Sequence, residues 1–431
     1  MFLLALASIL LVLIVLGAPI FLAMATASLL HYFDLGRDSA LVIMFQRFLS
    51  GTQSFTFLAI PMFLLSGFVM TQGGLTDRMI GLARALVGHV RGGLAQVNVL
   101  SSVFFGGISG SAHADVAAMG SIFIPAMKKE GYPPGFAAAL TAVSGTLAPM
   151  IPPSIVLIVY GSTFGVSIGA LFAAGLSVAL FIAISYSVMA YVLSRRYNIP
   201  RHHRATGKEK FEAFIRAAPP LAMPFVVVGG LMAGWFSPTE AGAVAAAYSL
   251  FLTMVVYRSM SLSQLWDVIL RSALTTAAIL AIVCAALMIT YAMGQRQIPM
   301  HTMVFLSGIT NDPHLLVSMI IAALLILGLF IDRTSALLMT GAIIIPVMTM
   351  IADFSAVHTA MIIVMALGVG HLTPPVGGTL LTTALVGNVS VWEISRYIWP
   401  YIILEISIVM LVVFVPEISE WLPRILGLGG L

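Results

Sequence analysis

One pattern occurs twice in this chain, and in both copies an apolar segment is interrupted by glycine and by a pair of prolines. The first copy runs from Gly120 to Pro152 and the second from Gly341 to Pro374, so the second is one residue longer (374 − 341 against 152 − 120). The two copies indicate an internal duplication. Interrupted apolar segments at matching places in two halves of a chain point to the binding site of a secondary transporter.

The composition requires a lipid environment. Of the 431 residues, 60% are hydrophobic and 8% are charged, whereas about a quarter of the residues in a soluble domain are charged. The basic residues behind the net charge of +4 lie in short loops, where they set membrane topology, so we expect membrane lipid and no nucleic acid as a partner. Cys284 is the single cysteine, which excludes a disulfide framework and a thiolate metal cluster.

Apolar segments long enough to cross a bilayer, which takes about 20 residues, occur along the whole chain. Residues 2–30 follow no basic residue and are too long for the apolar part of a signal peptide, so we expect a retained span. Further spans are predicted at 55–71, 136–163, 169–193, 220–236, 239–257, 272–293, 359–386 and 392–415. Segments 136–163 and 359–386 contain the Pro-Pro pairs and are predicted to be broken transmembrane helices.

Two regions are predicted to form re-entrant helical hairpins. Segments 94–108 and 116–127 are each too short to cross and flank a polar patch, which predicts a hairpin over residues 94–127. In the second copy, segments 314–331 and 336–350 predict a hairpin over 314–350. Irregular backbone survives at membrane depth only where protein or a water-filled cavity surrounds it, so both tips are expected to point inward.

The basic loop at 195–219 is predicted to be cytoplasmic. Three predicted spans separate this loop from Gln295, so the second hairpin enters from the opposite face and the repeats are inverted. Segments 73–93 and 262–271 are predicted to be amphipathic helices along the cytoplasmic surface. The expected fold is therefore an all-α integral membrane protein. Its predicted parts are N-terminal scaffold spans in 1–72, a first inverted repeat in 73–194, the loop 195–219, linking spans in 220–257, a second inverted repeat in 258–415 and a C-terminal tail in 416–431.

The broken helices provide ligands for a hard cation, because proline removes a backbone donor and leaves carbonyl oxygens free near the bilayer midplane. The predicted first cation site consists of Ser109, Gly110, Ser111, Gly145, Thr146 and Pro149. The predicted second site consists of Asp332, Thr334, Gly368, Gly370 and Thr373. The alternative is that these small residues only allow close packing of helices.

An anionic substrate is expected at the hairpin tips, because helix N-termini present N–H groups and the positive end of the dipole. The predicted substrate residues are Arg333, Ser111, Pro152 and Pro374. Arg333 either grips a carboxylate in a bidentate fork or extends to the outer surface.

Three further ionisable residues are candidates for coupling, because ionisable groups at membrane depth are functional candidates by default. Asp115 either binds a cation or proton or caps the helix that follows the first tip. His113 and His371 either take part in proton coupling or serve as hydrogen-bonded structural residues. For Asp332, the alternative to cation binding is a local ion pair with Arg333.

Five motifs resemble the large membrane subunit, of the DctM type, of tripartite ATP-independent periplasmic (TRAP) transporters, and the resemblance covers essentially the whole chain. The motifs lie at 104–129, 131–136, 144–154, 237–242 and 373–377. The resemblance implies an elevator-type importer in the bacterial inner membrane. It also implies co-transport of sodium (Na+), an organic-acid substrate taken from a periplasmic substrate-binding protein, and a small TRAP membrane subunit as partner. Ser335 and Ala366 depart from the family pattern in the second copy, which weakens the second cation site.

Two other functions fit parts of the sequence. One is an anion and sodium symporter of the same superfamily that needs no binding protein. The other is an intramembrane serine protease with Ser109 as nucleophile and His371 or His358 as base, because residues 107–110 match a Gly-x-Ser-Gly pattern. A protease has no need of an inverted repeat, so we expect a transporter and not an enzyme.

Overall fold

The computed structural model describes residues 8–10, 12–14, 16–34, 38–197, 204–310 and 312–428. Secondary structure in these residues is helical throughout, without a strand, and eight helical segments are long and apolar enough to cross a membrane. Parts of three predicted segments lie outside the described residues: 2–7, 11 and 15 of the first span, 198–203 of the basic loop and 429–431 of the tail.

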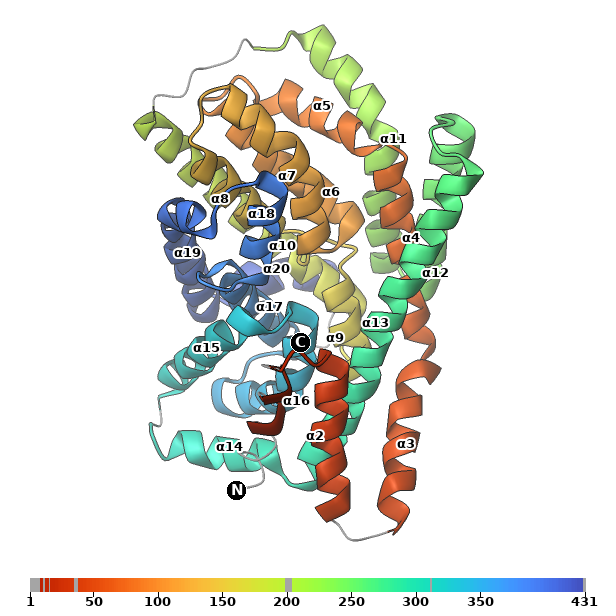
Figure 1. The fold of residues 1–431 in the computed structure, drawn as a ribbon, viewed down its shortest axis with the longest axis vertical. Helices are drawn as coiled ribbons and strands as arrows, with labels where there is room; N and C mark the ends of the chain where they lie inside the picture. The colour runs from red at the N-terminus through yellow and green to blue at the C-terminus, as the bar shows by residue number, and fades with distance from the viewer. Residues whose placement is uncertain are drawn as a thin grey trace.

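The two copies contain the same series of elements. The first comprises α5 (Thr76–Val87), α6 (Gly93–Ser109), α7 (Ala112–Lys129), α8 (Pro134–Gly145), α9 (Ile155–Phe164) and α10 (Ile168–Arg196). The second comprises α14 (Ile298–Ser307), α15 (Pro313–Phe330), α16 (Arg333–Ala352), α17 (Ala356–Leu372), α18 (Gly378–Gly387) and α19 (Val391–Phe414). In each copy a short helix precedes a hairpin, then a broken helix and then a long helix. Figure 1 shows the α6–α7 hairpin in the upper half of the molecule and the α15–α16 hairpin in the lower half, which confirms inverted repeats with hairpins and broken helices.

Side-chain caps form the hairpin tips at equivalent positions. Ser111 caps α7, and its hydroxyl accepts a hydrogen bond from the Ala114 N–H at 3.5 Å. Asp332 caps α16, and its carboxylate accepts hydrogen bonds from the N–H groups of Thr334 and Ser335 at 2.9 and 3.0 Å. The spacing of the two caps equals that of the repeated glycines (332 − 111 = 341 − 120). The inward tips therefore follow from local capping chemistry.

The two broken helices differ in the length of the break, which covers residues 146–154 in the first copy and 373–377 in the second. In both, the Pro-Pro peptide bond is cis. The first copy has Pro149 where the second has His371 (371 − 149 = 374 − 152). Proline has no N–H to continue the helix, so α8 ends at Gly145, whereas α17 continues to Leu372.

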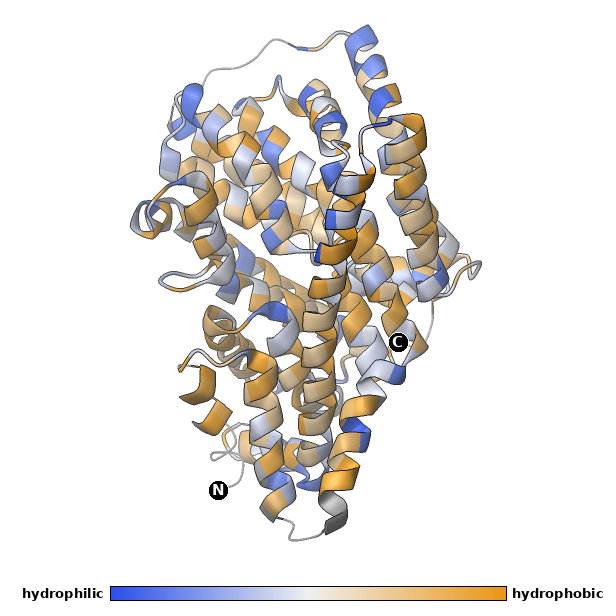
Figure 2. Ribbon diagram, turned by 45° about the vertical axis from the view of Figure 1, so that its right-hand side comes forward, coloured by the Kyte–Doolittle hydropathy of each residue, from blue (hydrophilic) through white to orange (hydrophobic). Residues whose placement is uncertain are grey.

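The remaining helices apart from α20 form a second group, at the right of Figure 1. This group contains α2 (Ile20–Asp34), α3 (Asp38–Gln53), the turn η1 (Phe55–Leu58), α4 (Ala59–Gln72), α11 (Gly207–Met232), α12 (Pro238–Leu250), its π-helical extension η2 (Phe251–Val256) and α13 (Leu262–Gln295). Helix α4 packs against α12 and α13, and α2 and α3 pack against α13. Figure 2 shows that these long helices are mainly hydrophobic, with hydrophilic residues gathered at the upper end of the molecule.

Several helix boundaries correct the sequence predictions. Residues 262–271 do not form a separate surface helix, because a capping box between Ser261 and Gln264 starts α13 there and the helix runs unbroken for 34 residues. The short helix of the second copy is α14, which lies across the lower end of the molecule directly before the hairpin (Figure 1). Helix α11 starts at Gly207, inside the predicted loop 195–219, and the predicted tail contains α20 (Glu417–Ile425). The boundaries proposed for the two repeats stay predictions.

The orientation in the membrane can be tested with two cysteines. Helices α11, α12 and α13 lie between Lys208 and Gln295, and Figure 1 places the start of α11 and the end of α13 at opposite ends of the molecule. With Cys284 replaced by serine, we expect an impermeant thiol reagent to label a cysteine at exposed Lys208 only from the cytoplasm. A cysteine at exposed Gln295 is expected to react only from the periplasm. Labelling of both positions from one side would contradict the inverted topology.

Candidate functional site

The two hairpin tips meet at a cavity of about 160 Å³. The tips and the first broken helix form one wall of this cavity, and α4 and α13 form the other. The predicted site residues that line it are Ser109, Gly110, Ser111, His113, Pro149, Asp332, Arg333, Thr334 and His371. Leu64, Gly67, Phe68, Thr71, Thr275 and Ile279 line it from α4 and α13, and the sequence analysis did not predict this second wall.

The tip of the first hairpin is packed tightly on both sides. Gly110 has a φ of +57°, and a β-carbon on it would lie 2.6 Å from the carbonyl oxygen of Pro153. A β-carbon on Gly67 of α4 would lie 2.8 Å from the Ile108 carbonyl oxygen. The buried hydroxyl of Ser109 has no hydrogen-bond partner. The glycines thus let the tip pack directly against backbone carbonyl groups, and the Ser109 hydroxyl at the cavity is left without a partner.

Asp115 lies behind this tip and is fully buried. Its Oδ2 accepts a hydrogen bond from the Ser102 hydroxyl at 2.8 Å, and its Oδ1 has no partner. Ser111, and not Asp115, caps α7. A β-carbon on Gly145, the last residue of α8, would lie 3.4 Å from Asp115 Oδ2, so the carboxylate borders the break. Because no described residue forms an ion pair with it, this buried charge needs a cation or a proton from outside the chain.

At the second tip the acid is Asp332, and unlike Asp115 it caps its own helix. The Asp332 carboxylate accepts hydrogen bonds from two backbone N–H groups and from the Ser335 hydroxyl. In the described part of the chain it forms no ion pair with Arg333. These capping bonds occupy most of the acceptor capacity of the carboxylate.

Arg333 points into the protein and not to the outer surface, because its side chain is 6% exposed. Its Nη1 donates to the Thr146 carbonyl oxygen at 3.4 Å, and its Nη2 has no partner. A β-carbon on Gly368 would lie 2.5 Å from Nη2, so the guanidinium packs directly against the backbone of this glycine.

Two residues beside Arg333 were missed from the sequence. Glu405 of α19 is 2% exposed, and its Oε1 would lie 3.7 Å from the same β-carbon on Gly368. The Glu405 carboxyl interacts with the hydroxyl of buried Tyr186 of α10. An acid in the middle of an apolar span is a functional candidate by default. Glu405 lies inside the predicted span 392–415, so it could have been predicted as a site residue from the sequence.

His113 and His371 approach each other from opposite repeats, with ring centroids 6.1 Å apart. His113 Nδ1 pairs with the Thr382 hydroxyl of α18 at 3.0 Å, and His371 Nδ1 lies 3.2 Å from the Leu367 carbonyl oxygen. Both imidazoles thus have structural hydrogen bonds and also line the cavity.

Eight predicted site residues do not line the cavity: Asp115, Gly145, Thr146 and Gly368, described above, and Gly370, Thr373, Pro152 and Pro374. Gly370 lets α15 and α17 approach, because a β-carbon on it would lie 2.6 Å from the Leu325 carbonyl oxygen. The Thr373 hydroxyl donates to the Val369 carbonyl oxygen at 2.7 Å. Pro152 and Pro374 lie in the breaks and do not line the cavity. For Gly370 the geometry fits the close-packing alternative.

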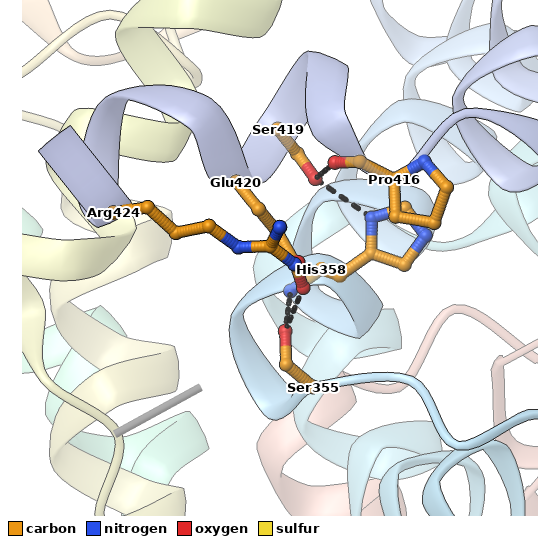
Figure 3. A network of polar contacts seen from close by, with 6 residues as sticks. All are labelled: Ser355, His358, Pro416, Ser419, Glu420 and Arg424. Carbon is orange, nitrogen blue, oxygen red and sulfur yellow. Dashed lines mark hydrogen bonds and ion pairs between the residues drawn. The ribbon is translucent and has the colours of Figure 1, made fainter. Parts of the chain in front are cut away.

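The geometry required of a serine protease is not formed by the described residues. The Ser109 hydroxyl makes no hydrogen bond, so it contacts no histidine base. His358 instead pairs with the Ser419 hydroxyl at 2.7 Å, where α20 docks on the start of α17 (Figure 3). The neighbouring Ser355 hydroxyl donates to Glu420 at 2.6 Å in the same network.

Comparisons with known proteins identify relatives over most of the chain. Residues 7–418 match the family described as "Tripartite ATP-independent periplasmic transporter, DctM component". The chain is 34% identical to the 2,3-diketo-L-gulonate TRAP transporter large permease protein YiaN of Escherichia coli, over 94% of this chain and 95% of that protein. It is 34% identical to the sialic acid TRAP transporter large permease protein SiaM of Vibrio cholerae, over 89% of this chain and 90% of that protein. It is also 35% identical to the C4-dicarboxylate TRAP transporter large permease protein DctM of Pseudomonas aeruginosa, over 88% of each.

A solved structure shares the fold. The crystal structure of the Alcanivorax borkumensis YdaH transporter, whose title describes an unusual topology, superposes with a TM-score of 0.63. The match covers 90% of both chains at 13% sequence identity, so the likeness concerns the fold alone.

Proposed function

Because this chain belongs to the DctM component family of tripartite ATP-independent periplasmic transporters, we propose that it is the large membrane subunit of a sodium-coupled importer of an organic acid. The named substrates of its relatives, diketogulonate, sialic acid and C4-dicarboxylates, are all carboxylates. In this proposal a periplasmic binding protein delivers the acid, and a small membrane subunit completes the complex in the bacterial inner membrane.

The observation that carries the sodium coupling is the unpaired carboxylate of Asp115. It is buried beside Gly145, where α8 ends, and it has one oxygen without a partner. Sodium is a hard cation that prefers oxygen ligands. We propose that the neutral oxygens of the first tip, with Ser109 foremost, and the carboxylate of Asp115 behind the tip supply these ligands.

The substrate carboxylate is proposed to bind at the N-terminus of α7. Both hairpin helices start at the cavity. The cap of α16 is an acid, whereas the cap of α7 is neutral Ser111, and the charge of Asp115 in the first turn of α7 would be balanced by the proposed sodium ion. A helix N-terminus with a neutral cap attracts an anion, whereas an acidic cap repels one. The cavity of about 160 Å³ is smaller than the roughly 300–1,000 Å³ of sites for drug-sized ligands. This favours a small carboxylate over a nine-carbon sugar acid.

The elevator movement is proposed from the position of the cavity. One wall comes from the hairpin tips and the other from α4 and α13, so the bound substrate lies between the helices of the two repeats and the second group of helices. Sliding of the hairpin group along α4 would carry the cavity across the membrane while the contacts within each group persist. Because Gly67 has no side chain, the Ile108 carbonyl of the first hairpin could move past α4 at this point without a steric clash.

The test is uptake by proteoliposomes that contain this chain and its small subunit, with binding protein and labelled acid outside. We expect uptake to require an inward sodium gradient and to fall about tenfold or more in Ser109→Ala, because a cation ligand is lost. Ser121→Ala is the matched control, since this exposed hydroxyl on α7 bonds only to its own helix and does not line the cavity.

Two outcomes would contradict this proposal. Uptake that is undiminished when potassium replaces sodium throughout would rule out sodium coupling. Full uptake without the binding protein would instead support the symporter of the wider superfamily that works alone.

A further inference from the structure

Arg333 has no charged counterpart in the first copy. The spacing of the capping residues makes Ala112 its counterpart in the first copy (333 − 112 = 332 − 111). The spacing of the Pro-Pro pairs makes Thr146 and Gly368 counterparts of each other (368 − 146 = 374 − 152). The guanidinium of Arg333 contacts both, through the Thr146 carbonyl and the face of Gly368. It therefore lies where equivalent points of the two broken helices meet.

An acid of the second copy lies near this guanidinium, although among the described residues the two groups do not form an ion pair within hydrogen-bonding reach. Glu405 is buried beside it on α19, with Oε2 unpartnered, and Tyr186 covers the carboxyl from α10. Among the described residues, no other acid is placed at Arg333 by the interactions of the chain. A buried cation and a buried anion stabilise each other only when both are present.

The ligands predicted for a second cation are used within the chain. The Asp332 carboxylate accepts three capping hydrogen bonds. The Thr373 hydroxyl donates to the Val369 carbonyl oxygen. Gly368 lies inside α17, because His371 continues the helix where Pro149 ends α8 in the first copy. The break of the second copy is therefore shorter, and it frees fewer backbone oxygens than the break at 146–154 in the first copy.

We propose that Arg333 is a built-in cation that takes the place of a second coupled sodium ion, with Glu405 as its counter-ion. The chain then binds sodium in its first copy alone, and the positive charge of the second copy stays fixed in the protein. This inference rests on the proposed sodium coupling. It also gives Arg333 an anionic partner other than the substrate carboxylate.

The test measures sodium binding without transport. The full-length chain is purified in detergent, and its melting temperature is titrated with sodium at constant ionic strength made up with potassium. We expect Arg333→Gln to melt below the wild type in potassium, because Glu405 loses its counter-ion. Sodium then recovers much of this loss. The coefficient that relates stability to the logarithm of the sodium concentration is expected to be higher than in the wild type by the equivalent of about one bound ion, because an extra ion that binds the folded state raises stability.

Three variants make the result specific. Arg333→Lys keeps the charge and is expected to retain the wild-type coefficient. The double variant Arg333→Gln with Glu405→Gln removes both charges and is expected to fold without gaining a sodium ion. Arg271→Gln, at an exposed position on α13, is the matched control and is expected to behave as the wild type.

The outcomes separate this inference from the proposed function. A wild-type chain without any response to sodium would overturn the sodium coupling itself. A sodium-responsive wild type whose Arg333→Gln variant has the same coefficient would overturn the built-in cation alone. An extra sodium ion in the double variant would show that Glu405 is not the counter-ion, and this too would overturn the inference.

Discussion

Asp115→Asn is expected to abolish sodium-driven uptake while leaving the protein folded. Asparagine has the same shape, and its amide can keep the hydrogen bond with Ser102. The change removes the negative charge beside the first break, and uptake should fall about 100-fold or more, because loss of a ligand exceeds the 10- to 100-fold cost of losing a residue that only supports one.

The stability of the same variant gives the second half of this prediction. In sodium-free buffer the melting temperature should equal or exceed that of the wild type, because a buried carboxylate without a counter-ion is costly. The stabilisation by sodium should disappear. Asp267→Asn, at an exposed position on α13, is the matched control and should change neither property. Wild-type uptake with unchanged sodium dependence in Asp115→Asn would place the ion elsewhere.

Gly110→Ala is expected to unfold the first tip and to stop transport. The left-handed backbone at φ +57° costs an alanine about 1–2 kcal/mol. The new methyl group would also lie 2.6 Å from the Pro153 carbonyl oxygen, and overpacking of this kind costs a further ~1–3 kcal/mol. The measurements are the melting temperature and the rate of uptake.

Gly74→Ala separates these two costs. Gly74 has a φ of +68°, and a β-carbon on it meets no atom within 4 Å. It should therefore show only the conformational cost, with a smaller fall in melting temperature and nearly normal uptake. Equal effects of the two substitutions would mean that the tip does not press on the broken helix.

The primary sequence was sufficient to predict the hairpins, the broken helices and the inversion of the two copies, although not every helix boundary. Apolar length and prolines located the hairpins and broken helices, because a helix begins and ends through local hydrogen bonding and capping. An odd number of spans between the basic loop and Gln295 then required the two copies to enter from opposite faces. The same local rules could also have shown that Pro149 and His371 give breaks of different length.

Only the tertiary structure decided which polar groups meet. Arg333 was predicted either to hold a substrate carboxylate or to extend to the outer surface. The fold buries it at the cavity, between Thr146 and Gly368 and with Glu405 beside it. The wall formed by α4 and α13 and the docking of α20 at His358 were likewise absent from the predictions. Local pattern fixes where a helix starts and which residues it carries. Partners that are far apart in the chain come together only when whole helices pack, and that packing depends on the shapes of all the side chains between them.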